Sequence, residues 1–487
     1  MASLLEFHVP THHGRAADDA ARGSAAAPPL NAAIGEALHA HCRALFPVCR
    51  SITGPGLRAT LGYVAERIPL AVREVPSGTP VLDWTVPREW RPRAAWIRRL
   101  SGETVVDSAQ HSLHLLQYSH AVDRVVPLEE LQRHLHSLPE QPDLIPYRTA
   151  YYSDTWGFCL PHRVREAMRD EAYRVHVDAD LAEDGALSYG ECVLPGERAE
   201  EVLVSVHCCH PSLANDNLSG LSIALELARD LAGRRRRRLT WRFLFIPGTI
   251  GSLAWLAANR EGAVGRVRHG LVLSCLGDGG AFHYKASRRG DAPIDRIAAH
   301  VLRHEDPAGG GNRVLPFIPY GYDERQYCSP GFDLPVGCLM RSPNGTFPEY
   351  HTSADNLDFV RPEHLARSYA ALEAIAAVIE GDELLRSTAP YGEPQLGRRG
   401  LYAPIGGTGP AGGAGRGYDQ MTLLWVLNLA DGRHTLLDMA ERAGQPFAAV
   451  RAAADAAIAA GLLVPAEQPN GIPGTTATAG SVTQNAG

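Results

Sequence analysis

The chain has 487 residues, of which 45% are hydrophobic and 21% charged, and its formal net charge is −7. This composition is that of an ordinary globular protein, and the length exceeds what one hydrophobic core usually supports, so two or three structural units are expected. The acidic balance argues against nucleic acid or an anionic membrane surface as the main partner. The longest apolar runs have the length of strands and are too short to span a membrane.

The first residues and the cysteines both bear on the compartment. Residues 1–13 lack the basic start, apolar stretch and small-residue cleavage site of a secretory signal. The nine cysteines are scattered through core-like segments, apart from the adjacent pair Cys208 and Cys209, and no CxxC pair occurs. These features predict reduced thiols and a cytoplasmic protein.

The N-terminal part of the chain is predicted to contain two helices and a β-rich insertion. Residues 1–30 show no periodicity and are expected to be disordered. Apolar residues three to four apart predict a helix over residues 31–46, and a second is expected over 57–68. Residues 81–139 contain short β-rich runs with many aromatic side chains, which is typical of a small inserted β-rich subdomain. The flanking segments assigned to one α/β domain are residues 31–80 and 140–400.

Strand and helix patterns alternate after residue 200. Strand–helix–strand repeats of this length indicate an α/β fold with a mostly parallel sheet flanked by helices. Five consecutive arginines, residues 234–238, fall in a predicted turn, so a solvated loop is favoured over a nucleic-acid patch. The predicted strands are residues 201–206, 239–246, 270–276 and 335–340, and the predicted helices are 220–231, 252–259 and 362–380.

A C-terminal unit is expected beyond a glycine-rich linker at residues 406–417. Its outline is that of a winged-helix domain over residues 418–467, followed by a tail at 468–487 that is expected to be disordered. The predicted elements are helices over 422–429, 436–442 and 446–460 and a strand over 461–464.

The role of this C-terminal unit follows from its charges. The helix in the recognition position, residues 446–460, has Arg451 as its single basic residue. Without basic side chains the attraction to phosphates is absent, so nucleic-acid binding is not expected. Packing, or contact with a protein partner or a second copy of the chain, is favoured.

The segment that carries the chemistry is residues 201–220. An apolar strand runs into a loop that contains His207, His210 and Asp216 and then into a helix. In open parallel sheets ligands bind at the carboxyl ends of strands, and two imidazoles with a carboxylate match zinc. Each residue alone is more often a turn or helix cap, but three at one strand end favour a metal site.

Several strings of this sequence resemble the aminopeptidase-like family of bacterial proteins, relatives of the zinc-dependent exopeptidases. Many members of that family also end in a winged-helix-like domain. The resemblance extends over about residues 45–402 and implies the exopeptidase fold. The strings that carry it lie at residues 47–54, 82–90, 156–159, 210–220 (HPSLANDNLSG), 323–327 (DERQY), 349–355 (EYHTSAD) and 396–402.

The resemblance implies ligands for one or two Zn²⁺ ions. A strand-end histidine binds one metal in these exopeptidases, and His207 or His210 matches it. Asp216 matches the carboxylate that bridges the metals, and His351 matches the histidine of the second. Asp278 follows the strand after which an acidic ligand is expected, although its spacing differs.

One position departs from the family pattern. Relatives usually carry a glutamate where this chain has Gly248, and that glutamate is the general base of the zinc exopeptidases. Glycine cannot accept a proton, and loss of a general base costs roughly 10²–10⁴-fold in rate. Glu324, which could instead be a ligand, and Glu349 are the candidate replacements. Substrate contacts are expected from neighbours in the same two strings, Asp323, Arg325 and Tyr350.

Two functions follow. The first is a metal-dependent hydrolase of aminopeptidase type that acts on a small peptide or aminoacyl conjugate in a biosynthetic pathway. The second, motivated by Gly248, is a catalytically altered member that serves as a binding or scaffold protein or as an acyl-transfer tailoring enzyme. Tyr151 and Tyr152, which precede the metal strand, are expected in the core, with the wall of a substrate pocket as the alternative.

Overall fold

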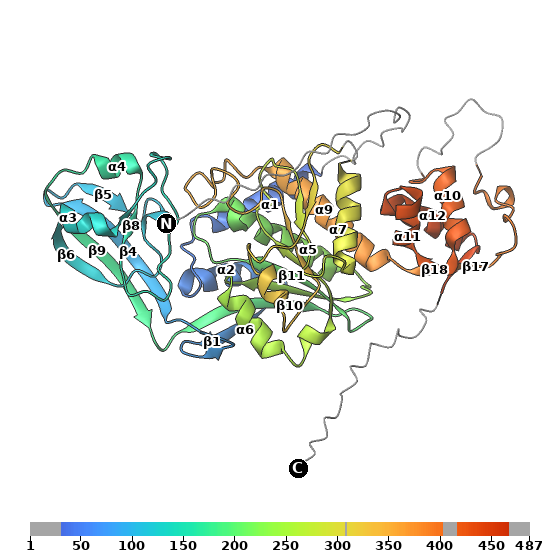
Figure 1. Cartoon of the computed structure of the whole chain (residues 1–487), viewed down its shortest axis with the longest axis horizontal. Helices are drawn as coiled ribbons and strands as arrows, with labels where there is room; N and C mark the ends of the chain where they lie inside the picture. Colours follow the sequence, from blue (N-terminus) through green and yellow to red (C-terminus); the bar gives the residue numbers. More distant parts are fainter. Residues whose placement is uncertain (1–30, 307–308, 403–415, 467–487) are drawn as a thin grey trace, which may run out of the picture.

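The computed structural model describes residues 31–306, 309–402 and 416–466. The predictions of disorder at both termini, and most of the predicted linker, lie outside the described residues. Figure 1 shows a central α/β part, with a β-rich part at one end and a C-terminal helical part at the other. No helix among the described residues is both long and apolar enough to cross a membrane.

The central part is built on an eight-stranded mixed sheet. Its strand order is β1-β10-β12-β11-β13-β16-β14-β15, and β11 runs parallel to both of its neighbours. Strand β10 is antiparallel to β12 at one side, and β14 is antiparallel to β16 at the other. The strands are β1 (Ala71–Pro76), β10 (Ala186–Leu194), β11 (Glu201–His207), β12 (Thr240–Ile246), β13 (Val267–Leu273), β14 (His283–Lys285), β15 (Arg313–Leu315) and β16 (Val336–Met340).

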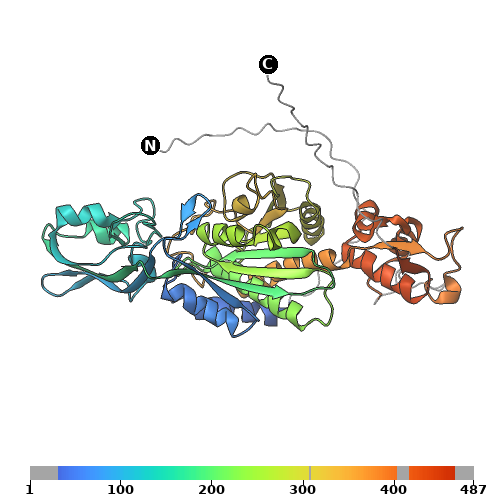
Figure 2. The same cartoon turned by 90° about the horizontal axis from the view of Figure 1, so that it is seen from below.

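Helices cover both faces of this sheet (Figure 2). Every residue of β11 is buried, because alternate side chains enter two cores. Val202, Val204 and Val206 pack with α1, α5 and α9, whereas Leu203 packs with α6 and α8 on the opposite face. The predicted α/β class is confirmed. The helices are α1 (Ala32–Leu45), α2 (Pro55–Ala65), α5 (Gly220–Gly233), α6 (Ile250–Asn259), α7 (Pro293–Glu305), α8 (Glu324–Tyr327) and α9 (Pro362–Gly381).

The β-rich part extends further along the chain than residue 139. Its four-stranded sheet has the order β5-β4-β9-β6, so β9 pairs with β4 across about 80 residues of sequence. The predicted boundary is therefore wrong, because the small sheet is incomplete without β9. Its elements are β2 (Pro80–Val81), β3 (Trp84–Thr85), β4 (Glu89–Arg99), β5 (Thr104–Asp107), β6 (Val122–Pro127), α3 (Leu128–Leu131), β7 (Leu135–His136), β8 (Phe158–Cys159), α4 (His162–Glu166) and β9 (Ala172–Ala182).

The C-terminal part has the three predicted helices and a three-stranded sheet. The central strand of that sheet, β17, precedes the predicted linker, so this unit begins earlier than residue 418. Thr435 and Asp438 form a capping box that starts α11. The elements are β17 (Leu384–Ser387), α10 (Gln420–Leu429), β18 (Asp431–Thr435), α11 (Leu436–Ala443), α12 (Phe447–Ala459) and β19 (Leu463–Pro465).

The five consecutive arginines lie in the loop between α5 and β12. Arg236 pairs with Glu197 at 2.6 Å, and Arg237 donates to the backbone carbonyl of Leu231 at 2.7 Å. The run thus holds its loop in place and, through Arg234 and Arg238, attaches it to α9.

Candidate metal centre and its cavity

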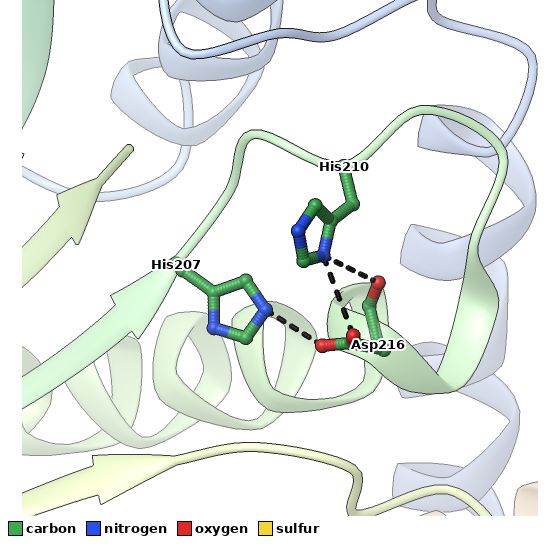
Figure 3. Close-up of side chains that lie close together, drawn as sticks. All are labelled: His207, His210 and Asp216. Atoms are coloured by element: carbon green, nitrogen blue, oxygen red, sulfur yellow. Dashed lines mark hydrogen bonds and ion pairs between the residues drawn. The ribbon is translucent and has the colours of Figure 1, made fainter. Parts of the chain in front are cut away.

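The side chains of His207, His210 and Asp216 converge where β11 ends (Figure 3). His207 is the last residue of the strand, His210 lies in the following loop, and Asp216 lies in the turn that enters α5. Nε2 of His207 is 2.7 Å from Oδ1 of Asp216, and Nδ1 of His210 is 3.5 Å from Oδ2. All three residues are buried.

His351 reaches the same carboxylate from a distant part of the chain. It lies between β16 and α9, and its Nε2 is 3.0 Å from Oδ2 of Asp216. Its side chain is 33% exposed, so this side of the cluster is open to solvent. The structure therefore brings together four of the five residues predicted as metal ligands.

His207 differs from the other two histidines because both of its ring nitrogens have protein partners. Nδ2 of Asn217 lies 3.3 Å from Nδ1 of His207, and Oδ1 of Asn217 accepts the Gly220 N–H, which fixes the amide orientation. His207 then carries its proton on Nε2 and donates it to Asp216. In this tautomer His207 orients the carboxylate and has no free lone pair for a metal ion.

The charge states of Asp216 and His351 suit metal binding. Burial lowers the pKa of His207 to about 4 and also lowers the pKa of His351, so both imidazoles are neutral near pH 7. Burial opposes ionisation of Asp216, but His210 and His207 outweigh it and hold the pKa of this carboxyl well below its usual value. Neutral imidazole and ionised carboxylate are the forms that bind metals.

A second carboxylate, Asp355, holds the loop beneath Asp216. It accepts the backbone N–H groups of Asn215 at 2.5 Å and of Asp216 at 2.9 Å. Burial raises the pKa of Asp355 to about 8. No role was predicted for Asp355 from the sequence, although it is the last residue of the string that contains His351.

Asp278 does not join the cluster. Its Oδ2 accepts a hydrogen bond from Nδ2 of Asn215 at 2.9 Å, and its Oδ1 accepts one from the Ser342 hydroxyl at 2.7 Å. The prediction that Asp278 binds metal is wrong in this geometry, because both carboxylate oxygens support the neighbouring loops.

Of the two glutamates proposed as a replacement base, Glu324 is engaged elsewhere. Glu324 is buried, forms an ion pair with Lys285 and accepts the backbone N–H of Tyr322 at 3.2 Å. The backbone carbonyl of Glu349 accepts a hydrogen bond from the Thr352 hydroxyl at 2.8 Å. The adjacent Tyr350 stacks on His351, with ring centroids 3.9 Å apart.

A cavity of about 600 Å³ opens beside His210. It contains Arg325, one of the predicted substrate residues, but not Asp323. Asp323 lies behind the wall, where it accepts the Thr249 N–H at 2.7 Å and the Ser252 hydroxyl at 3.0 Å, so the prediction that it contacts substrate is wrong. The lining residues are Ile52, Trp84, Tyr151, Tyr152, Cys209, His210, Gly248, Thr249, Ile250, Pro319, Tyr322, Arg325 and Gln326.

Aromatic side chains that the sequence analysis assigned to the core shape this site. Tyr151 and Tyr152 line the cavity. Tyr147, which that analysis did not single out, lies edge-on to His210 and His351, with ring centroids 5.0 Å from each. Its backbone N–H donates to the carbonyl of His351 at 2.8 Å. The three tyrosines lie close together in the sequence, and this clustering was the one feature that could have indicated a pocket. Periodicity alone does not distinguish side chains of a pocket wall from side chains of a core.

Tyr322 takes the space next to Gly248. A Cβ atom at residue 248 would lie well inside contact distance of the Tyr322 hydroxyl and ring. The same ring stacks on His207, with centroids 3.5 Å apart, and its hydroxyl is 3.6 Å from Sγ of Cys209. A phenol therefore occupies the position at which the resemblance places a glutamate side chain.

Comparison with known protein families shows to which family this chain belongs. Residues 39–382 match the family described as a domain of unknown function, DUF4910, and residues 383–465 match a winged helix-turn-helix family. The chain belongs to the DUF4910 family. The second match begins at residue 383, in agreement with the inclusion of β17 in the C-terminal unit.

Three relatives give this DUF4910 protein its context. A Clostridium acetobutylicum protein, provisionally named a polysaccharide biosynthesis protein with aminopeptidase-like domain, is 44% identical over 412 residues, which cover 85% of this chain and 92% of that protein. A crystal structure provisionally named a peptidase, also from C. acetobutylicum, has a TM-score of 0.82 at 41% identity, covering 89% of this chain and 97% of its own.

The third is BSAP, a zinc aminopeptidase from Bacillus subtilis. It has a TM-score of 0.51 at 13% identity and covers 71% of this chain and 94% of its own, so it shares the fold. The predicted resemblance to aminopeptidase-like proteins with a C-terminal winged helix is thus confirmed.

Proposed function

We propose that this protein is a peptidase-type enzyme that acts on an amide bond of a small substrate and binds one zinc ion through His210, Asp216 and His351. One observation carries the proposal. Two imidazoles and a carboxylate, separated by up to 141 residues in sequence (210 to 351), meet in a largely buried cluster beside a cavity.

The residues present fit such an ion. Two nitrogen donors and one carboxylate leave a fourth position open, which is the ligand set of catalytic zinc sites. His207 supplies the hydrogen bond that such sites use to orient a ligand. When bound, zinc polarises a carbonyl and lowers the pKa of a coordinated water to about 7.

The chain itself positions the proposed ligands and provides space for a substrate. His207 and Asp355 hold the side chain and the backbone of Asp216. Tyr147 and Tyr350 pack on His351 and restrict its ring. The cavity provides the volume for a substrate of a few residues.

A second candidate function rests on Gly248 and Tyr322. Tyr322 fills the space beside Gly248, where the usual base would lie, and Glu324 is paired with Lys285. A binding protein or an acyl-transfer enzyme that retains the cavity is therefore the alternative.

The name of the Clostridium relative supports a place in polysaccharide biosynthesis, which we include in the proposal.

The same proposal extends to location and partners. All nine cysteines are free in the structure, which supports a reducing, cytoplasmic compartment. Arg451 of α12 pairs with Glu383 and Asp455, so its charge is not available to phosphates. This pairing supports a packing or protein-contact role for the winged helix.

Metal analysis of the purified full chain tests the first function. We expect about one zinc per wild-type chain, loss of zinc in Asp216→Asn and His351→Ala, and retention in the control His364→Ala. The zinc-loaded protein is then incubated with a panel of aminoacyl amides. Unchanged zinc content in both variants, or no zinc-dependent release from any amide, would contradict the proposal.

A further inference from the structure

The cavity beside His210 has a cationic wall with no balancing anion. Of the lining residues that the structure describes, Arg325 is the single arginine or lysine, and none is aspartate or glutamate. The remaining lining residues are apolar, aromatic or neutral polar groups, apart from His210. A ligand that enters this space therefore meets one positive side chain and no acidic side chain on the wall itself.

The acidic neighbours of Arg325 in sequence are engaged elsewhere. Asp323 accepts hydrogen bonds from the start of α6, and Glu324 pairs with Lys285. Within the described part of the chain, Nε of Arg325 is buried and has no hydrogen-bond partner. Arg325 lines the cavity, and no hydrogen bond or ion pair to another described residue holds its guanidinium group, so a ligand that supplies an acceptor would stabilise this side chain.

Another part of the cavity wall suits an apolar group. Trp84 and Tyr152 are 43% and 53% exposed, and their rings meet edge to face with centroids 5.8 Å apart. The Tyr152 hydroxyl donates to the carbonyl of Thr85 at 2.9 Å, which fixes this ring. Exposed, immobilised aromatic rings in a cavity are typical of ligand contacts.

We propose that the cavity selects a substrate with a carboxylate, bound by Arg325, and an apolar group that packs on Trp84 and Tyr152. The guanidinium fork matches a carboxylate in two parallel hydrogen bonds. A phosphate carries nearly two negative charges and is commonly bound by several cations, whereas this wall offers one. This inference rests on the proposed function only for the statement that the bound molecule contains the amide to be cleaved.

Direct binding tests the inference without turnover. N-acetylphenylalanine and its amide, N-acetylphenylalaninamide, have nearly the same shape and the same apolar ring, but only the first carries a carboxylate. Calorimetry on the full chain is expected to show about tenfold tighter binding of the acid, which corresponds to one charge-assisted hydrogen bond. Arg325→Gln removes this preference, and the control Arg313→Gln, on exposed β15, keeps it. Equal affinities in the wild type, or a preference that persists in Arg325→Gln, would overturn the inference.

A second measurement, protection of arginine side chains from chemical labelling, can detect binding that is too weak for calorimetry. Phenylglyoxal labels arginine side chains, and peptide mass spectrometry reads the extent of labelling at each site. We expect succinate to slow the labelling of Arg325 but not of Arg313, and phosphate at the same ionic strength to protect less. Absence of protection by succinate, or better protection by phosphate, refutes a carboxylate site. Loss of amide hydrolysis alone leaves both measurements unaffected, so the two proposals fail separately.

Discussion

The phenol of Tyr322 and the missing side chain of Gly248 are complementary. The ring of Tyr322 stacks on His207 and extends to where a Cβ of residue 248 would lie. The glycine therefore does more than remove a general base, because the space of the missing side chain is occupied by the ring of Tyr322 from another segment. Restoring the glutamate requires that Tyr322 be removed as well.

We predict that Gly248→Glu alone gives no gain in amide hydrolysis and lowers the melting temperature, because the new side chain collides with Tyr322. The double variant Gly248→Glu/Tyr322→Ala is expected to hydrolyse aminoacyl amides at least about 10²-fold faster than Tyr322→Ala, the gain typical of a general base. Zinc-dependent release of the amine measures both. A stable single variant with the full gain would show that Tyr322 does not block the position.

The hydrogen bonds of His207 predict a different role from that of His351. His207→Gln keeps a donor for Asp216 and should retain one zinc per chain, with metal affinity lowered about 10–100-fold, as is usual for residues that orient a ligand. His351→Ala should lose stoichiometric zinc. Titration with a zinc chelator gives both affinities. Equal loss of metal in the two variants would make His207 a ligand.

Asp323 gives the protein a defined pH dependence. Burial raises the pKa of Asp323 to about 7, above the value of 3.8 for an exposed aspartate. Between pH 4 and pH 7 the folded state holds this proton and the unfolded state does not, so this residue's contribution to the free energy of unfolding falls as pH rises, by up to about 1.4 kcal/mol per pH unit.

The comparison that isolates this effect is between wild type and Asp323→Asn, which keeps an acceptor for the Thr249 N–H. Urea midpoints at pH 5 and pH 7 are expected to show a smaller decline in the variant than in the wild type. Asp333→Asn is the control, because Arg288 and Arg289 lower the pKa of Asp333 and give the opposite sign. Identical declines in wild type and Asp323→Asn would contradict the assignment.

Local patterns of the sequence predicted much of this fold and part of its site. The apolar run of β11 and the helical spacing of α5 fix the strand, loop and helix that carry His210 and Asp216. His351 was found through a resemblance, since nothing local relates it to Asp216. The pairing of β9 with β4, by contrast, depends on contacts across about 80 residues, which no local pattern contains.

The errors among the acidic residues have a common cause. Sequence shows that Asp278, Asp323 and Glu324 lie near the relevant strings, but not which way their side chains point. Their partners, the Asn215 amide, the Thr249 N–H and Lys285, come from other segments and are set by the tertiary fold. The filling of the space beside Gly248 by Tyr322 is likewise visible only in three dimensions.

The inserted β-rich part contributes to the cavity through Trp84, which follows β2 and begins β3. Trp84→Ala removes one face of the aromatic wall and is expected to weaken binding of N-acetylphenylalanine about three- to tenfold, the range for one aromatic contact. Zinc content should not change, because Trp84 does not contact the cluster. Trp96→Ala, which alters a ring stacked on His176 in the four-stranded sheet of the same β-rich part, is the matched control and should leave the affinity unchanged. If the two variants lose affinity equally, the insertion acts through its stability and not through this wall.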